Sequence, residues 1–248
     1  MNWDALEAEF DAWRAAKLTV PFWWRDDDAV DDTPALRRLL DVSERINIPA
    51  HIAVIPAKFS PSLTPILSEN RSLIPIVHGY AHQSHADVGE KNCEFSKGRL
   101  LSDVSAELKA GFSTLSNALG DGLAPLFVPP WNRFDAGFLH VLQGVGYKGI
   151  STFTPRQNRW ATDGLEQVNT HVDPIDWRGS RSLVNQKIIL NHTVMSLRDR
   201  RLGVADNSEP FGFLTHHLVH DEAIWAFSEQ FLERFAAGPV RLWTAWEL

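Results

Sequence analysis

Short apolar runs of strand length alternate with amphipathic helical segments along most of this chain. The strand candidates in the first half are 18–24, 49–55, 73–77 and 126–128. Two helical segments lie between them: 34–46 follows the capping residue Thr33, and 104–119 repeats apolar residues at helical spacing. Such alternation is typical of a parallel sheet with helices on its faces, so it predicts an α/β fold.

The second half of the chain continues the pattern with weaker signals. The strand candidates there are 147–153, 167–172, 187–190, 211–215 and 240–243. Helices are expected from about 135 to 144 and from 222 to 237, where Gly238-Pro239 ends the second one. The segment 154–164 has no regular pattern and is the hardest to assign.

Length and charge restrict the classes of protein to which the chain can belong. With 248 residues it is long enough for one large domain spanning 1–248, a length that α/β barrels commonly have. Its formal net charge of −7 comes with no run of lysine and arginine, which argues against nucleic acid as a partner. No stretch approaches the ~20 apolar residues that cross a bilayer, so no membrane partner is expected. None of these features indicates an oligomeric state.

The N-terminus and the single cysteine bear on location and on metal chemistry. Residues 1–17 carry acidic side chains and place apolar residues from Trp3 to Trp13 at helical spacing, which predicts a helix rather than a secretory signal. A cytoplasmic location is therefore expected. Cys93 is the only cysteine, so a metal site within one chain must be built from histidines and carboxylates.

Polar side chains gather where the expected strands end. The clusters are Arg25 to Asp28, His78 to His85, Pro129 to Arg133, Asp173 to Trp177, and His216-His217. The carboxyl ends of parallel strands meet at one rim, and barrel enzymes draw their catalytic groups from that rim. We therefore expect these clusters to form one site.

The first two clusters contain the residue types of a metal site. Asp26, Asp27 and Asp28 repel one another unless a metal ion or an arginine lies nearby. A solvated turn that caps the next helix is the alternative. His78 and His82 are close enough in sequence for both imidazoles to reach one divalent ion. Such a pair is weak on its own among ten histidines, but a carboxylate at an upstream strand end strengthens it.

Five motifs, in this order, resemble the polysaccharide deacetylase family (NodB-homology, similar to the carbohydrate esterase 4 proteins). They are Asp26-Asp27, His78-x-x-x-His82, Pro129-Pro130-Trp131, Asp173-x-x-Asp176-Trp177 and Leu214-x-His216. The resemblance spans residues 24 to about 217. It implies a distorted (β/α) barrel and a hydrolase that removes N- or O-acetyl groups with a divalent ion, either zinc or else cobalt or nickel.

Carried over by motif, the resemblance gives Asp26 the role of general base. Asp27, His78 and His82 would then be the metal ligands, and Asp28 would stand where the family usually has glycine. A register shifted by one residue would make Asp27 the base and Asp28 the ligand. The pattern from Arg25 to Asp27 fits the first register better.

The later motifs imply an acid and an oxyanion contact. The backbone N–H of Trp131 would help to hold the oxyanion, and His216, tuned by Asp173, would protonate the leaving group. His192, which also follows an expected strand, is the alternative for the late histidine. Trp131 and Trp177 are the two tryptophans that we expect to stack on a sugar ring.

One position departs from the family pattern. Val128 stands where the third motif has an arginine that pairs with the base, so we expect Arg25 or Arg133 to replace it. His85, three residues beyond His82, is a weaker candidate for an additional ligand.

Together these residues predict a hydrolase of carbohydrate metabolism, in which metal-activated water removes an acetyl group from an amino sugar or another glycan. Two alternatives stay open. One is a hydrolase of a small non-sugar amide or cyclic imide on the same fold. The other is a metal-binding or glycan-binding domain without turnover, suggested by the missing arginine at Val128.

Overall fold

Helices and strands alternate in the computed structural model, which describes residues 2–248. The helices are α1 (Asp4–Ala15), α2 (Pro34–Ile46), α3 (Leu63–Glu69), α4 (Leu101–Leu119), α5 (Leu139–Val145), α6 (Gln186–Arg201) and α7 (Glu222–Ala237). The strands are β1 (Val20–Ala29), β2 (Ala50–Val54), β3 (Leu73–His78), β4 (Leu126–Val128), β5 (Gly149–Ile150), β6 (Trp160–Thr162), β7 (Leu165–Gln167), β8 (Phe211–Thr215) and β9 (Val240–Leu242). The short 3₁₀ helices are η1 (Pro56–Lys58), η2 (Gly120–Gly122), η3 (Pro130–Asn132), η4 (Ala136–Phe138), η5 (His217–Val219) and η6 (Ala245–Glu247). None of the helices within residues 2–248 combines the length and the apolar character needed to cross a membrane.

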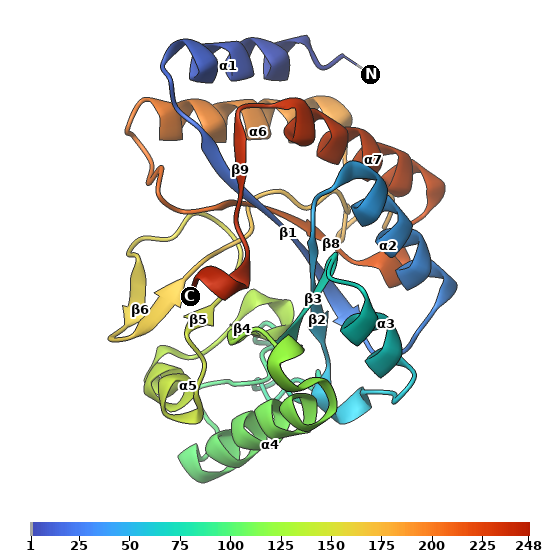
Figure 1. Ribbon diagram of the computed structural model, residues 1–248. Helices are drawn as coiled ribbons and strands as arrows, with labels where there is room; N and C mark the ends of the chain where they lie inside the picture. Colours follow the sequence, from blue (N-terminus) through green and yellow to red (C-terminus); the bar gives the residue numbers. More distant parts are fainter. Residues whose placement is uncertain (1) are drawn as a thin grey trace.

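The strands form one curved sheet with helices around its outside (Figure 1). The strand order is β6-β7-β5-β4-β3-β2-β1-β8, with β9 beside β1, and every pair is parallel except β6 with β7. The segment after β7 closes the ring. Thr170 forms a parallel bridge with Phe153, and Val172 forms one with Phe213 of β8. The fold is therefore the distorted (β/α) barrel that the sequence predicts.

Two apolar cores lie on the two sides of the barrel wall. The larger one fills the space between the wall and the helices and includes Phe22 and Trp24 of β1. The smaller one fills the interior and includes Trp23 of β1 and Ile76 of β3. Because successive side chains of a strand point to opposite faces, this alternation decides which polar residues of β1 reach the interior.

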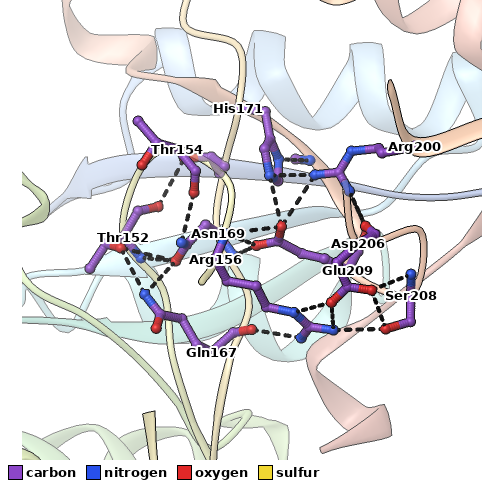
Figure 2. Close-up of polar contacts among 12 residues, drawn as sticks. Thr152, Thr154, Arg156, Gln167, Asn169, His171, Arg200, Asp206, Ser208 and Glu209 are labelled. Carbon is purple, nitrogen blue, oxygen red and sulfur yellow. Dashed lines mark hydrogen bonds and ion pairs between the residues drawn. The ribbon is translucent and has the colours of Figure 1, made fainter. Parts of the chain in front are cut away.

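A buried polar network fastens the segment that closes the barrel (Figure 2). Glu209, just before β8, is buried and accepts the backbone N–H groups of Arg156 and Asn169, each at 3.2 Å. The side chains of Arg200 and His171 also lie 3.2 Å from its Oε2 atom. A buried carboxylate is costly unless it is paired and hydrogen-bonded, so this set of partners accounts for its burial and ties α6 to the closing segment.

Most of the expected elements are confirmed, and the differences have local causes. The N-terminal helix is α1, and α2 begins after Thr33, whose Oγ1 accepts the N–H of Leu36 at 3.1 Å. The strand expected at 187–190 is wrong, because these residues lie in α6, whose buried side chains recur at helical spacing. The strand expected at 18–24 continues to Ala29, so the aspartates lie within β1 rather than after it.

Candidate active site

The barrel wall separates the consecutive polar residues of β1. Arg25 and Asp27 share the inward face with Trp23, and Arg25 reaches Ser151, where Nη1 donates to Oγ at 2.7 Å. Asp26 shares the outward face with Trp24 and contacts Thr215 of β8 at 2.6 Å. The alternation of the strand therefore gives neighbouring carboxylates different surroundings.

Asp28, His78 and His82 form the one cluster, among the residues that the structure describes, whose side chains could share a metal ion. Oδ1 of Asp28 lies 3.1 Å from Nε2 of His78 and 3.3 Å from Nε2 of His82. The sequence predicts Asp27 in this cluster, whereas the structure brings the carboxylate of Asp28 to the two histidines. The pairing of β1 is irregular between Asp26 and Ala29, and Asp28 has a φ of 75°, so its side chain turns toward β3.

The ring of His78 is held in one orientation by the backbone of β4. Its Nδ1 lies 3.0 Å from the carbonyl oxygen of Val128. Because a carbonyl oxygen only accepts, Nδ1 carries a proton, and Nε2 is the nitrogen that faces Asp28. A hydrogen bond on the far nitrogen is the usual support of a metal-binding imidazole. Val128, which stands where the family has arginine, thus contributes its backbone.

The donor set fits a divalent transition metal ion. One carboxylate and two imidazoles leave positions open for water and substrate, as in catalytic zinc sites, and cobalt and nickel accept similar ligands. Burial opposes ionisation of Asp28, but hydrogen bonds from His78 and His82 hold the pKa of its carboxyl well below the usual range. The cluster therefore offers an anionic oxygen close to two imidazole nitrogens.

Arg25 supplies a cation where the family's arginine is missing. Its guanidinium is buried, and Nη2 donates to Oδ2 of Asp27 at 3.0 Å. Nε lies 3.0 Å from Oδ1 of Asp27, in a contact too bent for a hydrogen bond. Nη2 also donates to Oδ1 of Asn132 at 2.7 Å. Nη1 donates to Ser151, as noted above. The side chains of Asp27, Asn132 and Ser151 therefore hold the guanidinium of Arg25 in place.

Asp26, for which the sequence predicts the role of base, lies on the outward side of the wall, away from the cluster. Its Oδ2 accepts the hydroxyl of Thr215 at 2.6 Å and the N–H of His217 at 3.0 Å, and its Oδ1 bonds to Nδ1 of His217. Burial would raise the pKa of Asp26, but the charge and the hydrogen bond of His217 outweigh it and lower that pKa. The carboxylate that faces the interior is Asp27, as in the shifted register.

His216 follows β8 on the inward face, since Phe213 and Thr215 face outward. The indole of Trp177 packs edge-on against its ring, with centroids 4.7 Å apart. Oδ2 of Asp173 accepts the indole N–H at 2.8 Å, so the contact from Asp173 to His216 runs through Trp177. Burial raises the pKa of Asp173, despite the charge of His216 and the bond from Trp177.

The turn around Trp131 has the backbone geometry of a strained functional segment. Trp131 and Asn132 have φ values of 56° and 57°, and His82 has 55°, all in the region that favours glycine. The N–H groups of Asn132 and Arg133 bond to Pro129 and Pro130 within the turn, which leaves the N–H of Trp131 as its candidate oxyanion donor. The indole of Trp131 lies 4.4 Å from the ring of His82, centroid to centroid.

The remaining candidates lie away from this cluster. Arg133 donates to the carbonyl oxygen of Asn92 at 2.8 Å, so of the two expected arginines only Arg25 is paired with an aspartate of β1. His85 is exposed, and His192 is an exposed residue of α6 rather than the end of a strand.

Sequence reasoning missed three residues: Asn132, Ser151 and Glu94. Asn132 and Ser151 hold Arg25, and Glu94 is a buried carboxylate beneath the loop that carries His82. Asn132 adjoins the third motif, which was the only available signal for any of them.

No protein-family model and no curated protein matches the chain. Solved structures do resemble it. An esterase of the CE4 family from Streptococcus mutans has a TM-score of 0.56 at 13% identity, covering 94% of this chain and 90% of that one. A family 4 carbohydrate esterase from Streptomyces lividans, in complex with acetate, has a TM-score of 0.53 at 16% identity, covering 91% and 92%.

A family 4 acetyl xylan esterase from Clostridium thermocellum, in complex with a cobalt ion, has a TM-score of 0.52 at 14% identity, covering 91% of this chain and 88% of that one. At sequence identities this low, the similarity shows a shared fold and nothing further. The chain therefore has the barrel fold of the family 4 carbohydrate esterases and polysaccharide deacetylases, as the order of its motifs predicts.

Proposed function

We propose that this protein is a metal-dependent hydrolase that removes an acetyl group from an amino sugar or another glycan. The observation that carries the proposal is the placement of the Asp28-His78-His82 cluster and the Asp27–Arg25 pair at one rim of the barrel. The fold supports it, since two structures of similar fold were solved with acetate and with cobalt.

Asp28, His78 and His82 would hold the ion, for which zinc, cobalt and nickel are the candidates. When bound, such an ion polarises the acyl oxygen and lowers the pKa of water from 15.7 toward about 7. This assignment moves the carboxylate ligand from Asp27 to Asp28 and keeps both histidines.

Asp27 would take the proton of the water molecule that attacks the acyl carbon. Its Oδ1 lies 3.0 Å from Nε of Arg25 but accepts no hydrogen bond among residues 2–248, so acceptor positions on that oxygen remain for the proton. Arg25 lies 3.0 Å from both oxygens and donates a hydrogen bond to Oδ2, which fixes the plane of the carboxylate and balances its charge. A base must lie within hydrogen-bond reach of the proton that it removes, and the proposal assigns this role to Asp27 because it faces inward and precedes Asp28.

The remaining steps fall to groups that follow β4 and β8. The N–H of Trp131 would donate to the oxyanion, a contribution worth roughly 3 kcal/mol per donor in other enzymes. His216, packed against Trp177, would protonate the leaving nitrogen or oxygen as the bond to the acyl carbon breaks. The products are acetate and a free amine or alcohol. The indoles of Trp131 and Trp177 flank the site, where they could stack on a sugar ring.

The test combines metal content with acetate release. We expect the stripped protein to bind about one zinc or cobalt ion per chain, and the His78→Ala variant to lose most of that affinity, because a ligand is removed. The metal-loaded wild type should release acetate from N-acetylated sugar oligomers or peptidoglycan fragments. Release from small amides alone would favour the small-amide alternative, and metal binding without any hydrolysis would favour the binding domain.

A further inference from the structure

A buried carboxylate lies beneath the loop that carries His82. Glu94 is fully buried, and its side chain accepts hydrogen bonds from three backbone N–H groups. Oε2 accepts from Tyr80 at 3.1 Å, and Oε1 accepts from Ala81 at 2.7 Å and from Gln83 at 3.4 Å. The two shorter hydrogen bonds thus come from residues before His82, and the longest comes from the residue after it.

These bonds satisfy a segment that has left the sheet. The last residue of β3 is His78, and the chain then turns through Gly79 and His82, with φ values of 56° and 55°. Backbone N–H groups in such a turn need acceptors when they are buried. The two carboxylate oxygens of Glu94 accept three of these N–H groups. A single side chain therefore fixes the backbone conformation between His78 and His82.

The backbone at Gly79 packs directly against the carboxylate of Glu94. A Cβ atom on residue 79 would lie 2.1 Å from Oε2 of Glu94, far inside contact distance. Only glycine combines that close approach with a positive φ. The turn can therefore form only with glycine at residue 79 if the carboxylate stays in place.

The segment that carries Glu94 is tied to a second part of the site. The next residue, Phe95, forms a parallel bridge with Phe134 and accepts the N–H of Asp135 at 3.0 Å. Phe134 lies two residues beyond the η3 turn that contains Trp131. Glu94 thus holds the loop of His82 from a segment that is itself fixed to the chain leaving the Trp131 turn.

We propose that Glu94 is a positioning residue of the metal site, which sets where His82 stands relative to His78 and Asp28. The inference rests on the proposed function, because it assumes that these three side chains bind a divalent ion. Glu94 itself does not reach the ion. It acts by holding the backbone on both sides of one ligand, and groups that orient metal ligands in this way typically change metal affinity 10- to 100-fold.

The test uses Glu94→Gln, which keeps the shape of the side chain but places an N–H₂ group where one carboxylate oxygen accepts a backbone N–H. The matched control is Glu209→Gln, since Glu209 is also a buried carboxylate that accepts two backbone N–H groups, in the network that closes the barrel (Figure 2). Glu94→Asp, which withdraws the carboxylate by one methylene, is the second variant if Glu94→Gln does not fold.

Zinc or cobalt alone is titrated into the metal-stripped wild type and variants. We expect the Kd of Glu94→Gln to rise about 10- to 100-fold, and that of Glu209→Gln to stay within about twofold of the wild type. Equal metal affinity in Glu94→Gln and the wild type would overturn the proposal.

A second readout needs no metal. Amide hydrogen exchange in the stripped protein should be faster at Tyr80 and Ala81 in Glu94→Gln, and unchanged there in Glu209→Gln. Unchanged exchange at these amides would overturn the anchoring role. If the wild type binds no metal while Glu94→Gln still speeds exchange, the proposed function fails but the anchoring of the loop stands.

Discussion

The inward and outward faces of β1 each carry a buried aspartate, and the two aspartates differ in how many hydrogen bonds they accept. On the inward face, Asp27 has one carboxylate oxygen bonded to Arg25 and another without a hydrogen-bond partner among the described residues. On the outward face, both oxygens of Asp26 are bonded, to Thr215 and to His217. Residue type does not distinguish the two carboxylates, whereas hydrogen-bond saturation does.

The difference has an energetic meaning. A buried carboxylate with all its acceptor positions used stabilises the native contacts around it, and removing one partner typically costs about 3–5 kcal/mol. A buried carboxylate with an oxygen that accepts no hydrogen bond keeps acceptor positions with which it can take a proton from a substrate or a water molecule. We therefore predict that Asp26 stabilises the rim and that Asp27 takes part in its chemistry.

The sharpest way to break this comparison is to neutralise each carboxylate in turn. Asp27→Asn keeps the size of the side chain but cannot take a proton, so kcat should fall roughly 10³- to 10⁴-fold, within the range of a lost general base. Metal affinity should change little, because Asp28 is the proposed ligand. Steady-state acetate release and metal titration of the same preparation measure both effects.

The control is Asp26→Asn, which should keep kcat within about threefold of the wild type and lower the melting temperature instead. It removes the charge that His217 and Thr215 stabilise, without touching the interior. Loss of turnover in Asp26→Asn with full turnover in Asp27→Asn would reverse the two assignments and restore the register that the motif alignment favours.

The same contrast extends to the consecutive histidines after β8. His216→Ala should lower kcat about 10²- to 10³-fold and leave metal bound, because an acid that serves only the leaving group contributes to the transition state alone. His217→Ala removes the partner of Asp26 and should act on stability rather than on kcat. Full activity in His216→Ala with loss of activity in His217→Ala would place the acid outside the barrel interior and contradict the model of the site.

Much of the rim could be predicted from the sequence, because strand ends in a parallel barrel converge whatever the details of packing. His78, His82, Trp131 and His216 all lie where their motifs placed them relative to the strands. The register of the aspartates could not be predicted in the same way. It depends on where β1 ends and on the irregularity between Asp26 and Ala29, and one residue of error moves a side chain to the other face.

Long-range contacts account for what else was missed. Glu94 lies 16 residues beyond His78, in a segment without periodic pattern, and only the folded chain brings it under the His82 loop. The 187–190 segment reads as a strand by its apolar run, although the continuing helical spacing of α6 decides its structure. Short apolar runs cannot separate the two by themselves.

The smallest expected effect concerns His51, a second inward histidine whose position shows that facing the interior is not sufficient for reactivity. It lies on β2 toward the opposite end of the barrel, beside the rings of Trp23 and Trp243. Nδ1 donates to the carbonyl oxygen of Trp24 at 2.9 Å, and Nε2 accepts the N–H of Ala245 at 3.0 Å. Both nitrogens are used, so the ring is held neutral.

Burial lowers the pKa of His51 from 6.5 to about 4, against the bond to Trp24. Between those two pH values the unfolded chain binds a proton that the folded chain does not, so the free energy of unfolding must fall as pH decreases from about 6.5 toward 4. From pH 6.5 to pH 5 this residue should account for about 1.5 kcal/mol, because the full slope of about 1.4 kcal/mol per pH unit is reached only below pH 6. His51→Gln can still donate and accept but does not titrate. Urea unfolding of the metal-free proteins should therefore show a shallower pH dependence in the variant, by close to one proton, and equal slopes would mean that His51 is protonated in the folded protein.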